Sequence, residues 1–568
     1  MTTDTVASPP QKELKREFTF RSTFSLAFAF ISPIIGLYTI FALALSTAGP
    51  AFWMGFAVVL GGQLLVALVL AELASVWPLA GGLYKWTQRL SGARVGWAAG
   101  WAYIWTLIVL VTAQCYAAAP FLASLLGSDA PGTGALILLS GAILLLATGV
   151  NWLGPRALKL FVAISISAEI LGSVVIGTIL LLFFRELPIS SVFGGAGGTG
   201  VALAPMLGAV ALIGWSFIGF ESAGDIAEEV EEPERAVPRA LVLSLVVVAL
   251  SISAEILGSV VIGTILLLFF RELPISSVFG GAGGTGVALA PMLGAVALIG
   301  WSFIGFESAG DIAEEVEEPE RAVPRALVLS LVVVALIVMY AALGLILAVP
   351  DLGAAIAGGA ADPISDTITA ALGAGVATPL FVMVVLAFVA GIAAVQAAVS
   401  RVIFSLARDG ELPAAGALSR LSGPDNLPRN ALGTSAVAAA VFLLVTLSEN
   451  AYATLLAMAT VGFYISFAFP VMSALRTRLR GAWTPGVWNI GRLAFAVNVL
   501  AAGWLTFEII NIAWPRLPDA AWYVNYGALM VVALVAVSGV LVRGMMSRRG
   551  DAGAAIPEGV ALEQGAQR

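Results

Sequence analysis

The chain has 568 residues, of which 60% are hydrophobic and only 11% are charged, and its net charge is −7. Soluble domains carry about a quarter of charged residues, so this composition excludes an ordinary water-soluble protein. Residues 22–71 contain no Asp, Glu, Lys or Arg, which leaves room for two membrane spans of about 20 residues each. Because the apolar runs are continuous and do not alternate, they indicate helices and exclude a barrel.

The chain is predicted to begin and end with short cytoplasmic tails around one membrane domain. Residues 1–21 contain no short apolar core followed by a cleavage site, so no signal peptide is expected. The membrane domain is predicted over 22–545, and the second tail over 546–568. About fourteen helical spans are predicted, over 23–46, 52–74, 97–126, 133–150, 157–183, 201–224, 240–270, 287–310, 325–349, 379–404, 431–448, 452–474, 488–513 and 522–542.

The basic residues indicate which way the chain is inserted. With these spans, 25 of the 28 Lys and Arg residues fall on the side of the N-terminus. The opposite side keeps only Arg185, Arg271 and Arg516. Basic residues accumulate on the cytoplasmic side of membrane proteins. We therefore expect a multi-pass protein of the plasma (inner) membrane with both termini in the cytoplasm.

The chain also contains a perfect internal repeat. Residues 165–250 and 251–336 are identical at all 86 positions. Repeats inherited from an old duplication survive only as weak symmetry in transporters, so this copy indicates a recent duplication or a sequence-assembly error. Removing one copy leaves 482 residues and about twelve spans. The copied block contains two spans, an even number, so its insertion leaves every later loop on the same side of the membrane.

Four segments carry a family resemblance. They are SLAFAFISPIIGLYTIFALAL in the first span, AELASVWPLAGGLYKW at 71–86, GWSFIGFESAGDIAEEVEEPERAVPRA at 214–240 and 300–326, and QAAVSRVIFSLARDGELP at 396–413. Together they resemble the amino acid–polyamine–organocation superfamily of permeases, most closely its amino acid/choline branch. The resemblance extends over about 19–542 once one repeat is set aside. It implies an all-α polytopic fold with two inverted five-helix repeats, two further C-terminal helices, and one extra helix pair from the duplication.

The resemblance also implies that two helices are broken in mid-membrane, and the residues agree. Pro33 lacks a backbone donor and with Gly36 predicts an interrupted first helix. Gly305 and Gly310, like Gly219 and Gly224 in the first copy, weaken the other helix in the same way. Unwound backbone in lipid is costly unless it lines a cavity, so paired breaks predict a binding site. A packing kink is the alternative for either break alone.

The charges that are missing define the chemistry of the predicted substrate site. No span has Lys or Arg near its middle, so free N–H groups would have to bind a substrate carboxylate. A substrate ammonium would need carbonyl oxygens, the Glu307 carboxylate or an aromatic face. A protonated Glu307 that only hydrogen-bonds to backbone is the alternative. The predicted substrate-binding residues are Ser32, Pro33, Ile34, Gly36, Ile304, Gly305, Phe306 and Glu307, with Ile218, Gly219, Phe220 and Glu221 as the duplicate set.

A proton-coupled step would have to use carboxylates, because the chain contains no His. The candidates are Glu169, its copy Glu255, and Glu508, each of which falls in an apolar segment. A structural hydrogen bond between helices is the alternative for Glu169 and Glu255. The acidic run at 228–235 is interpreted as a solvated cytoplasmic loop, and the pairs at 400–401 and 408–409 as gating or topology elements.

These features predict secondary active transport of a small amino acid or amine by alternating access, coupled to protons or by exchange. A transporter-like sensor, or a membrane protein disabled by the duplication, is the alternative. The chain has no phosphate-binding loop of an ATP-driven pump and no nucleophile–base pair of an enzyme. It has no repeated filter of a channel and no basic–aromatic patch for nucleic acid. No cofactor or metal is expected. Linker lengths favour the second copy of the broken helix in the site, with either copy possible.

Overall fold

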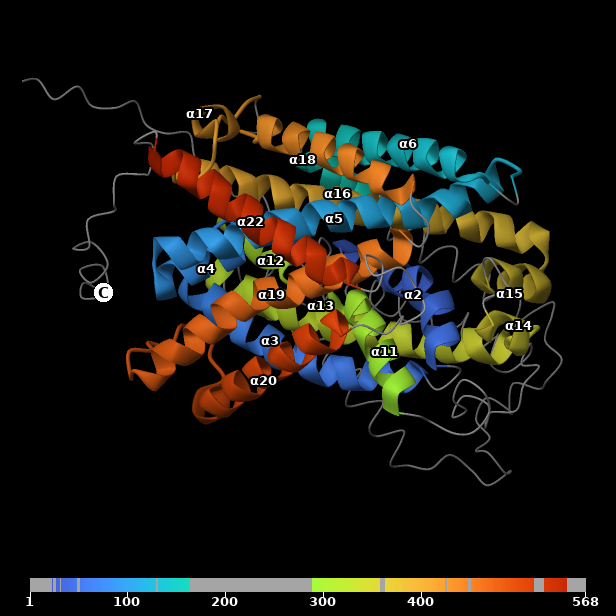
Figure 1. Ribbon diagram of the computed structural model, residues 1–568, viewed down its shortest axis with the longest axis horizontal. Helices are drawn as coiled ribbons and strands as arrows, with labels where there is room; N and C mark the ends of the chain where they lie inside the picture. The colour runs from blue at the N-terminus through green and yellow to red at the C-terminus, as the bar shows by residue number, and fades with distance from the viewer. Residues whose placement is uncertain are drawn as a thin grey trace, which may run out of the picture.

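The computed structural model describes residues 23, 27–30, 32–48, 52–128, 131–163, 289–357, 363–423, 426–447, 451–514 and 526–548. Over these ranges the chain forms helices and connecting loops and no extended strand (Figure 1). The prediction of an all-α polytopic membrane protein is therefore confirmed. Nine helices of the described ranges are long and apolar enough to cross a membrane. The predicted spans at 201–224 and 240–270, and most of that at 157–183, lie outside these ranges.

Each predicted span inside the described ranges corresponds to helix. The longer helices are α2 (Pro33–Ala48), α3 (Met54–Val76), α5 (Ala93–Leu125), α6 (Thr133–Trp152), α13 (Pro319–Ala348), α16 (Ala374–Arg408), α18 (Arg429–Phe442), α19 (Ala451–Leu479), α20 (Ala494–Ala513) and α22 (Gly527–Arg548). The shorter elements are α4 (Gly82–Ser91), α11 (Leu289–Ile299), η5 (Gly300–Phe303), α12 (Ser308–Asp311), η6 (Ala313–Glu315), α14 (Leu352–Ile356), α15 (Pro363–Leu372), α17 (Ala415–Leu418), η7 (Leu443–Leu447) and η8 (Gly491–Leu493).

The helix boundaries follow from local chemistry. The helix α13 begins at Pro319, whose fixed φ suits a first turn and whose missing N–H costs nothing there. The helix α4 ends at Ser91 and is followed by Gly92, where φ is +86°, and the helix α16 starts after Gly373, where φ is +75°. Both values lie in the region that only glycine adopts without strain. A single glycine therefore separates α4 from α5 and α15 from α16, and neither α4 nor α15 was among the predicted spans.

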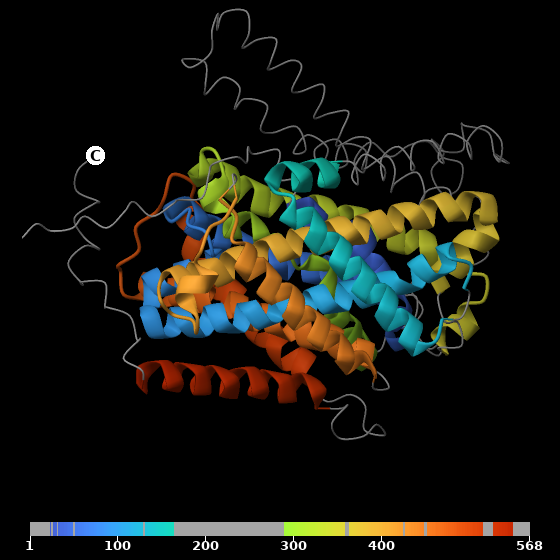
Figure 2. The same ribbon diagram turned by 90° about the horizontal axis from the view of Figure 1, so that it is seen from above.

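The long helices form one bundle around α5. This helix contacts α16 and α19 along much of its length, and α4 and α6 pack on either side of it. The helix α13 packs on α3, and α11 lies against both α2 and α3. Figure 2 shows α22 on the outside of the bundle, where it contacts α19 and α5. The interior of this bundle holds the two segments at which helices are interrupted.

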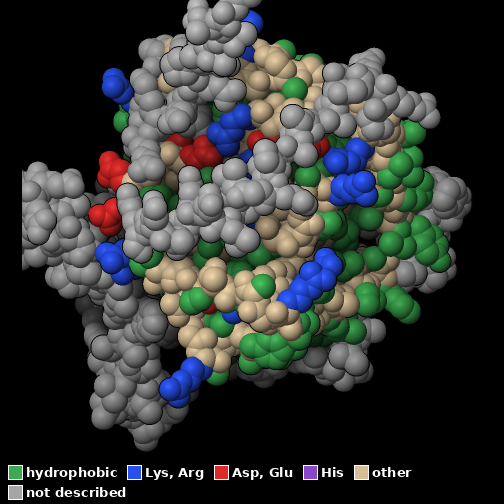
Figure 3. Space-filling model, turned by 90° about the vertical axis from the view of Figure 1, so that its left-hand side faces the viewer, with side chains coloured by type: hydrophobic (Ala, Val, Ile, Leu, Met, Phe, Trp, Pro, Cys, Tyr) green, Lys and Arg blue, Asp and Glu red, His purple; other side chains and the backbone are tan. Residues whose placement is uncertain are grey.

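Ion pairs gather at one end of the bundle, which Figure 3 shows face-on with Lys, Arg and acidic side chains spread across it. We call it the basic end, after Lys85, Arg401, Arg408, Arg478 and Arg543. Their ion-pair partners are Asp409, Glu315, Glu314, Glu72 and Glu411, in the same order. These pairs join α3, α4, η6, α16, α19 and α22, so they connect elements that are far apart in the sequence.

The helix α4 is held to α16 by one of these pairs. The Lys85 ammonium lies 2.5 Å from an oxygen of Asp409, and the Tyr84 hydroxyl donates to the same oxygen at 2.5 Å. Burial lowers the pKa of Lys85, and the adjacent Asp409 carboxylate opposes this change. Burial likewise raises the pKa of Tyr84, and Asp409 adds to the effect. The tyrosine hydroxyl therefore stays neutral and available as a donor.

The acidic run that precedes α13 is only partly a solvated loop. Its first-copy version, 228–235, lies outside the described residues, and the second copy is at 314–321. There the Glu315 carboxylate is buried and accepts from Arg401 at 2.8 and 3.2 Å. The Glu314 carboxylate accepts from Arg408 at 3.0 and 3.1 Å. The interpretation as a solvated loop is thus wrong for these two residues, because fork-shaped arginines on α16 pair with them.

We predict that Glu315→Ala lowers the free energy of unfolding by about 3–5 kcal/mol, because it leaves the buried Arg401 charge without its partner. The matched control is Glu317→Ala in the same acidic run, whose side chain is exposed and which should change stability by about 0.5 kcal/mol or less. Thermal unfolding of both purified variants in detergent measures the difference. Equal losses of stability in the two variants would contradict the buried ion pair.

Candidate functional site

The first helix of the bundle is distorted at Ser32, directly before Pro33, where the sequence predicts a break, although the Ser32 N–H still donates to the Phe28 carbonyl at 2.7 Å. Residues 27–30 are helical, and α2 begins only at Pro33. Between them Ser32 has a φ of +35°, which L-residues rarely adopt. The Ser32 hydroxyl accepts from the Ile35 N–H at 3.3 Å, and the Ser32 carbonyl accepts from the Gly36 N–H at 2.8 Å. The new helix therefore starts with a serine in the capping position that serine favours.

The second break lies in the segment that the sequence pairs with the first. The helix α11 continues into η5, which ends at Phe303, and α12 begins only at Ser308. Between them Ile304 and Gly305 are not helical, and the φ of Gly305 is +114°. The Glu307 carboxylate accepts from the Gly305 N–H at 2.9 Å. A side chain thus satisfies a backbone donor that the helix has left free.

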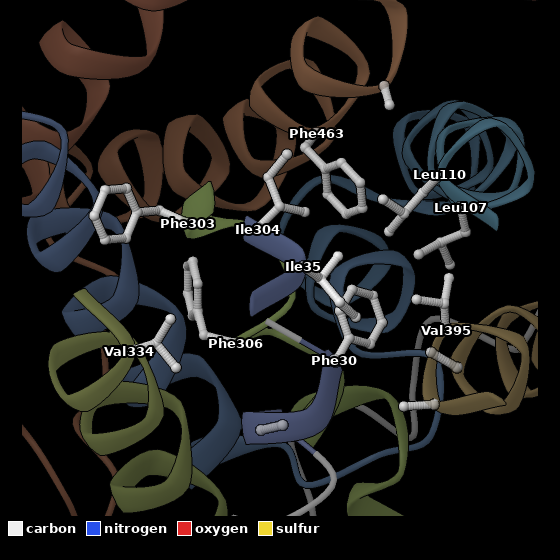
Figure 4. Close-up of a cluster of buried hydrophobic side chains, with 14 of the residues drawn as sticks. Phe30, Ile35, Leu107, Leu110, Phe303, Ile304, Phe306, Val334, Val395 and Phe463 are labelled. Carbon is white, nitrogen blue, oxygen red and sulfur yellow. The ribbon is translucent and has the colours of Figure 1, made fainter. Parts of the chain in front are cut away.

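The two breaks contact each other directly. The Ser302 hydroxyl donates to the Gly36 carbonyl at 2.7 Å. A Cβ on Gly36 would lie 3.2 Å from the Cβ of Ser302, so a side chain there would require Ser302 to shift by a few tenths of an ångström. In Figure 4, Phe30 and Ile35 from the first break lie beside Ile304 and Phe306 from the second. In the described residues, the second copy of the duplicated segment lies against α2; the broken helix of the first copy lies outside these residues.

A cluster of two carboxyl groups and one hydroxyl lies beside the second break. The Tyr103 hydroxyl of α5 donates to an oxygen of Asp311 at 2.7 Å and approaches an oxygen of Glu307 at 3.4 Å. Glu307 is 1% exposed and Asp311 is 0% exposed. Neither carboxylate has an ion-pair partner among the described residues. We call Tyr103, Glu307 and Asp311 the carboxylate cluster.

Most of the predicted site residues lie together. Six of them surround the two breaks with described side chains, and Pro33 and Ile34 form the start of α2. The six are Ser32, Gly36, Ile304, Gly305, Phe306 and Glu307. The duplicate set Ile218, Gly219, Phe220 and Glu221 and the coupling candidates Glu169 and Glu255 lie outside the described residues.

Glu508, the third coupling candidate, lies elsewhere in the bundle. It is buried on α20, where the Asn511 amide donates to it at 3.4 Å. The same amide donates at 3.1 Å to the carbonyl of Leu293 in α11. Glu508 is therefore connected to the helix that leads into the second break, but it is not part of the carboxylate cluster.

Sequence reasoning missed three residues of the site. Ser302 and Tyr103 carry no signal that separates them from other apolar-segment residues of their type. Asp311 does carry one, because it follows Glu307 by four positions and residues at that spacing share a helix face. Placing two carboxylates four residues apart in a buried segment costs free energy, and such residues are therefore candidates for a functional site. This spacing could have been used, whereas the contact with α5 required the structure.

We predict that Gly305→Ala destabilises the protein by about 2–4 kcal/mol, because its φ is strained for L-residues and the added Cβ would lie 2.0 Å from the Phe30 ring. The control is Gly433→Ala in the interior of α18, where a Cβ meets no atom within 4 Å and the higher helix propensity of alanine should raise stability by about 0.5–1 kcal/mol. Thermal unfolding in detergent tests both variants. A Gly305→Ala protein as stable as the control would contradict the positive φ of Gly305 and its close contact with the Phe30 ring.

The chain is similar to known permeases over nearly its whole length. The family model described as "Amino acid permease" matches residues 22–252 and 260–535. The amino-acid permease BAT1 of Arabidopsis thaliana is 24% identical over 542 residues, which cover 93% of this chain and 91% of the relative.

Two other relatives match over shorter parts. The choline transporter of Saccharomyces cerevisiae is 25% identical over 42% of each chain. The branched-chain amino acid permease BcaP of Bacillus subtilis is 27% identical over 42% of this chain and 54% of its own. Since the family model covers most of the chain, this protein belongs to the amino acid permease family.

Proposed function

We propose that the protein is a secondary active transporter that moves a small amino acid or amine across the plasma membrane by alternating access. The observation that carries the proposal is the direct contact between two helices that are both interrupted inside an apolar bundle. The Ser302 hydroxyl, in the second, donates to the Gly36 carbonyl, in the first, at 2.7 Å. Broken helices of this kind supply free backbone dipoles where lipid-exposed helices cannot.

The two breaks suit a substrate that carries both a carboxylate and an ammonium group. The start of α2 supplies the positive end of a helix dipole, which attracts a carboxylate. The break at Ile304 and Gly305 supplies carbonyl oxygens, and Glu307 supplies negative charge. Phe306 adds an aromatic side chain for the ammonium. Pro33 and Ile34 complete the set as the backbone that starts α2.

The ion pairs at the basic end suit a gate that opens and closes. Each connects elements that come from different parts of the chain, and several are partly exposed, such as Arg543 with Glu411. Breaking them would open the basic end toward the two breaks, while new contacts close the other end. By the excess of basic residues the basic end is cytoplasmic, with both termini on that side. Proton coupling or substrate exchange would supply the driving force.

We predict that the purified protein in liposomes exchanges labelled amino acids or amines, and that an imposed pH gradient changes the amount accumulated. The 568-residue chain and the 482-residue chain that lacks one copy are measured in parallel, because the described residues of the bundle include only one copy of the broken helix. Exchange by both chains supports the proposal. Exchange by the shorter chain alone means that the duplication disables the protein. No movement of any tested compound by either chain favours a sensor.

The duplication provides a matched pair of variants for the site itself. Glu307→Gln removes the negative charge beside the second break and should lower the apparent affinity for substrates with a cationic nitrogen by about tenfold or more. Glu221→Gln makes the same change in an identical sequence context in the first copy and should leave the affinity unchanged. A loss in Glu221→Gln alone would assign the site to the first copy.

A further inference from the structure

We infer that Asp311 is the residue that binds the transported proton, and that its ionised form holds the N-terminus of α4 against the broken helix. This inference rests on the proposed function, because it names the group that couples transport to a pH gradient. Asp311 belongs to the carboxylate cluster and was not among the coupling residues predicted from the sequence. Its burial, its hydrogen bonds and its position between the second break and the basic end assign it this role.

The carboxylate cluster contains more negative charge than its surroundings can hold. Glu307 and Asp311 are both fully buried, and one hydroxyl, that of Tyr103, lies between them. Like charges at such short range in a low-dielectric interior cannot both be ionised at moderate cost. No Lys or Arg of the described residues forms an ion pair with either carboxylate. The cluster is therefore built to take up a cation, and the smallest one is a proton.

The hydrogen bonds assign this proton to Asp311. The Glu307 carboxylate accepts from the Gly305 N–H at 2.9 Å and is also approached by Tyr103. The Asp311 carboxyl accepts from Tyr103 through Oδ2, while its Oδ1 is buried and has no hydrogen-bond partner among the described residues. The anion with fewer donors is the less stabilised one. The unpartnered Oδ1 of Asp311 is thus the atom that a proton would occupy, which leaves Glu307 ionised for the substrate.

The same oxygen points at the start of α4. A Cβ placed on Gly82 would lie 3.0 Å from Asp311 Oδ1, and the Gly81 N–H donates to the Asp311 carbonyl at 3.2 Å. The N-terminus of a helix carries partial positive charge and attracts an anion. The negative charge of ionised Asp311 therefore attracts the N-terminus of α4, whereas protonated, neutral Asp311 does not. Lys85 and Tyr84 bind α4 to Asp409 at the end of α16. A change in the attraction between Asp311 and α4 therefore acts on the ion pairs of the basic end.

The charged and titratable groups around Asp311 do not neutralise its charge, so its protonation state can change. From α5 it faces Tyr103, from its own segment Glu307, and from α4 the backbone at Gly81 and Gly82. The cations of α16 and α4 named above are paired with carboxylates: Arg401 with Glu315 of η6, Arg408 with Glu314, and Lys85 with Asp409. The helix α13, which also packs on α12, carries the exposed Glu320 and Arg321 and the half-buried Arg325.

The test uses the full chain in liposomes and separates exchange from proton-driven uptake. Three quantities are measured for each protein: counterflow of the substrate, accumulation under an imposed pH gradient, and the internal pH reported by an entrapped dye. The variants are Asp311→Asn, Asp311→Glu and Asp225→Asn, with Glu508→Gln as the competing carboxylate. Asp225 has the same sequence neighbours in the first copy as Asp311 has in the second.

We predict that Asp311→Asn lowers the ratio of accumulation to counterflow by about tenfold or more and abolishes the acidification that accompanies substrate entry. Asp311→Glu restores a pH-dependent ratio, because it restores a titratable group, which a merely structural role would not require. Asp225→Asn keeps the ratio of the unmodified protein. An unchanged ratio and proton entry in Asp311→Asn, or their loss in Asp225→Asn or Glu508→Gln instead, overturns the inference.

Two further readouts keep the test decisive. Absence of counterflow in the unmodified protein contradicts the proposed function, whereas counterflow without any effect of Asp311→Asn contradicts only this inference. If Asp311→Asn does not fold, Tyr103→Phe replaces it, since it removes the hydroxyl that favours ionised Asp311. The midpoint of the pH profile of uptake should then move to higher pH. A midpoint that does not move contradicts the role of Asp311.

Discussion

The architecture depends on one constraint, which is that backbone groups released by a broken helix must be satisfied inside the protein. Lipid offers no hydrogen bonds, and an unsatisfied group there costs several kcal/mol. The protein meets this constraint with its own side chains. The Ser32 hydroxyl accepts from the Ile35 N–H and the Glu307 carboxylate accepts from the Gly305 N–H, while the Ser302 hydroxyl joins the second break to the Gly36 carbonyl in the first turn of α2. Each break thus satisfies a donor with its own side chain, and the bond from Ser302 to Gly36 holds the two segments together.

Charged residues are treated in opposite ways in the two regions that carry them. At the basic end, each of the named cations pairs with a carboxylate, as Arg401 pairs with Glu315 through two hydrogen bonds. Beside the second break, Glu307 and Asp311 share only a tyrosine hydroxyl. Paired charges are locally neutral and hold elements together, whereas unpaired buried charges respond to whatever cation arrives. Ion pairs thus hold the helices together at the basic end, while the carboxylates in the interior can bind a cation.

The duplication shows the limit of local sequence as a determinant of structure. Residues 165–250 and 251–336 are identical, so no propensity, pattern or motif can distinguish them. The two copies differ only in the stretches of chain to which they are joined. The second copy continues into 337–348, the remainder of α13, which packs on α3 next to α11. The described part of the second copy therefore packs against α2 and α3 and is joined directly to the remainder of α13.

The sequence by itself determined the class of the protein, most of its helices and the location of both breaks. Apolar runs without charge must form helices in lipid, and Pro33 and Gly305 interrupt them for reasons of backbone chemistry that need no tertiary context. The tertiary structure alone decided which groups meet across helices. The partnership of Tyr103 with Asp311, and of Arg401 with Glu315, joins residues more than 80 positions apart. Such contacts depend on how the bundle packs, which a one-dimensional pattern of hydrophobicity does not encode.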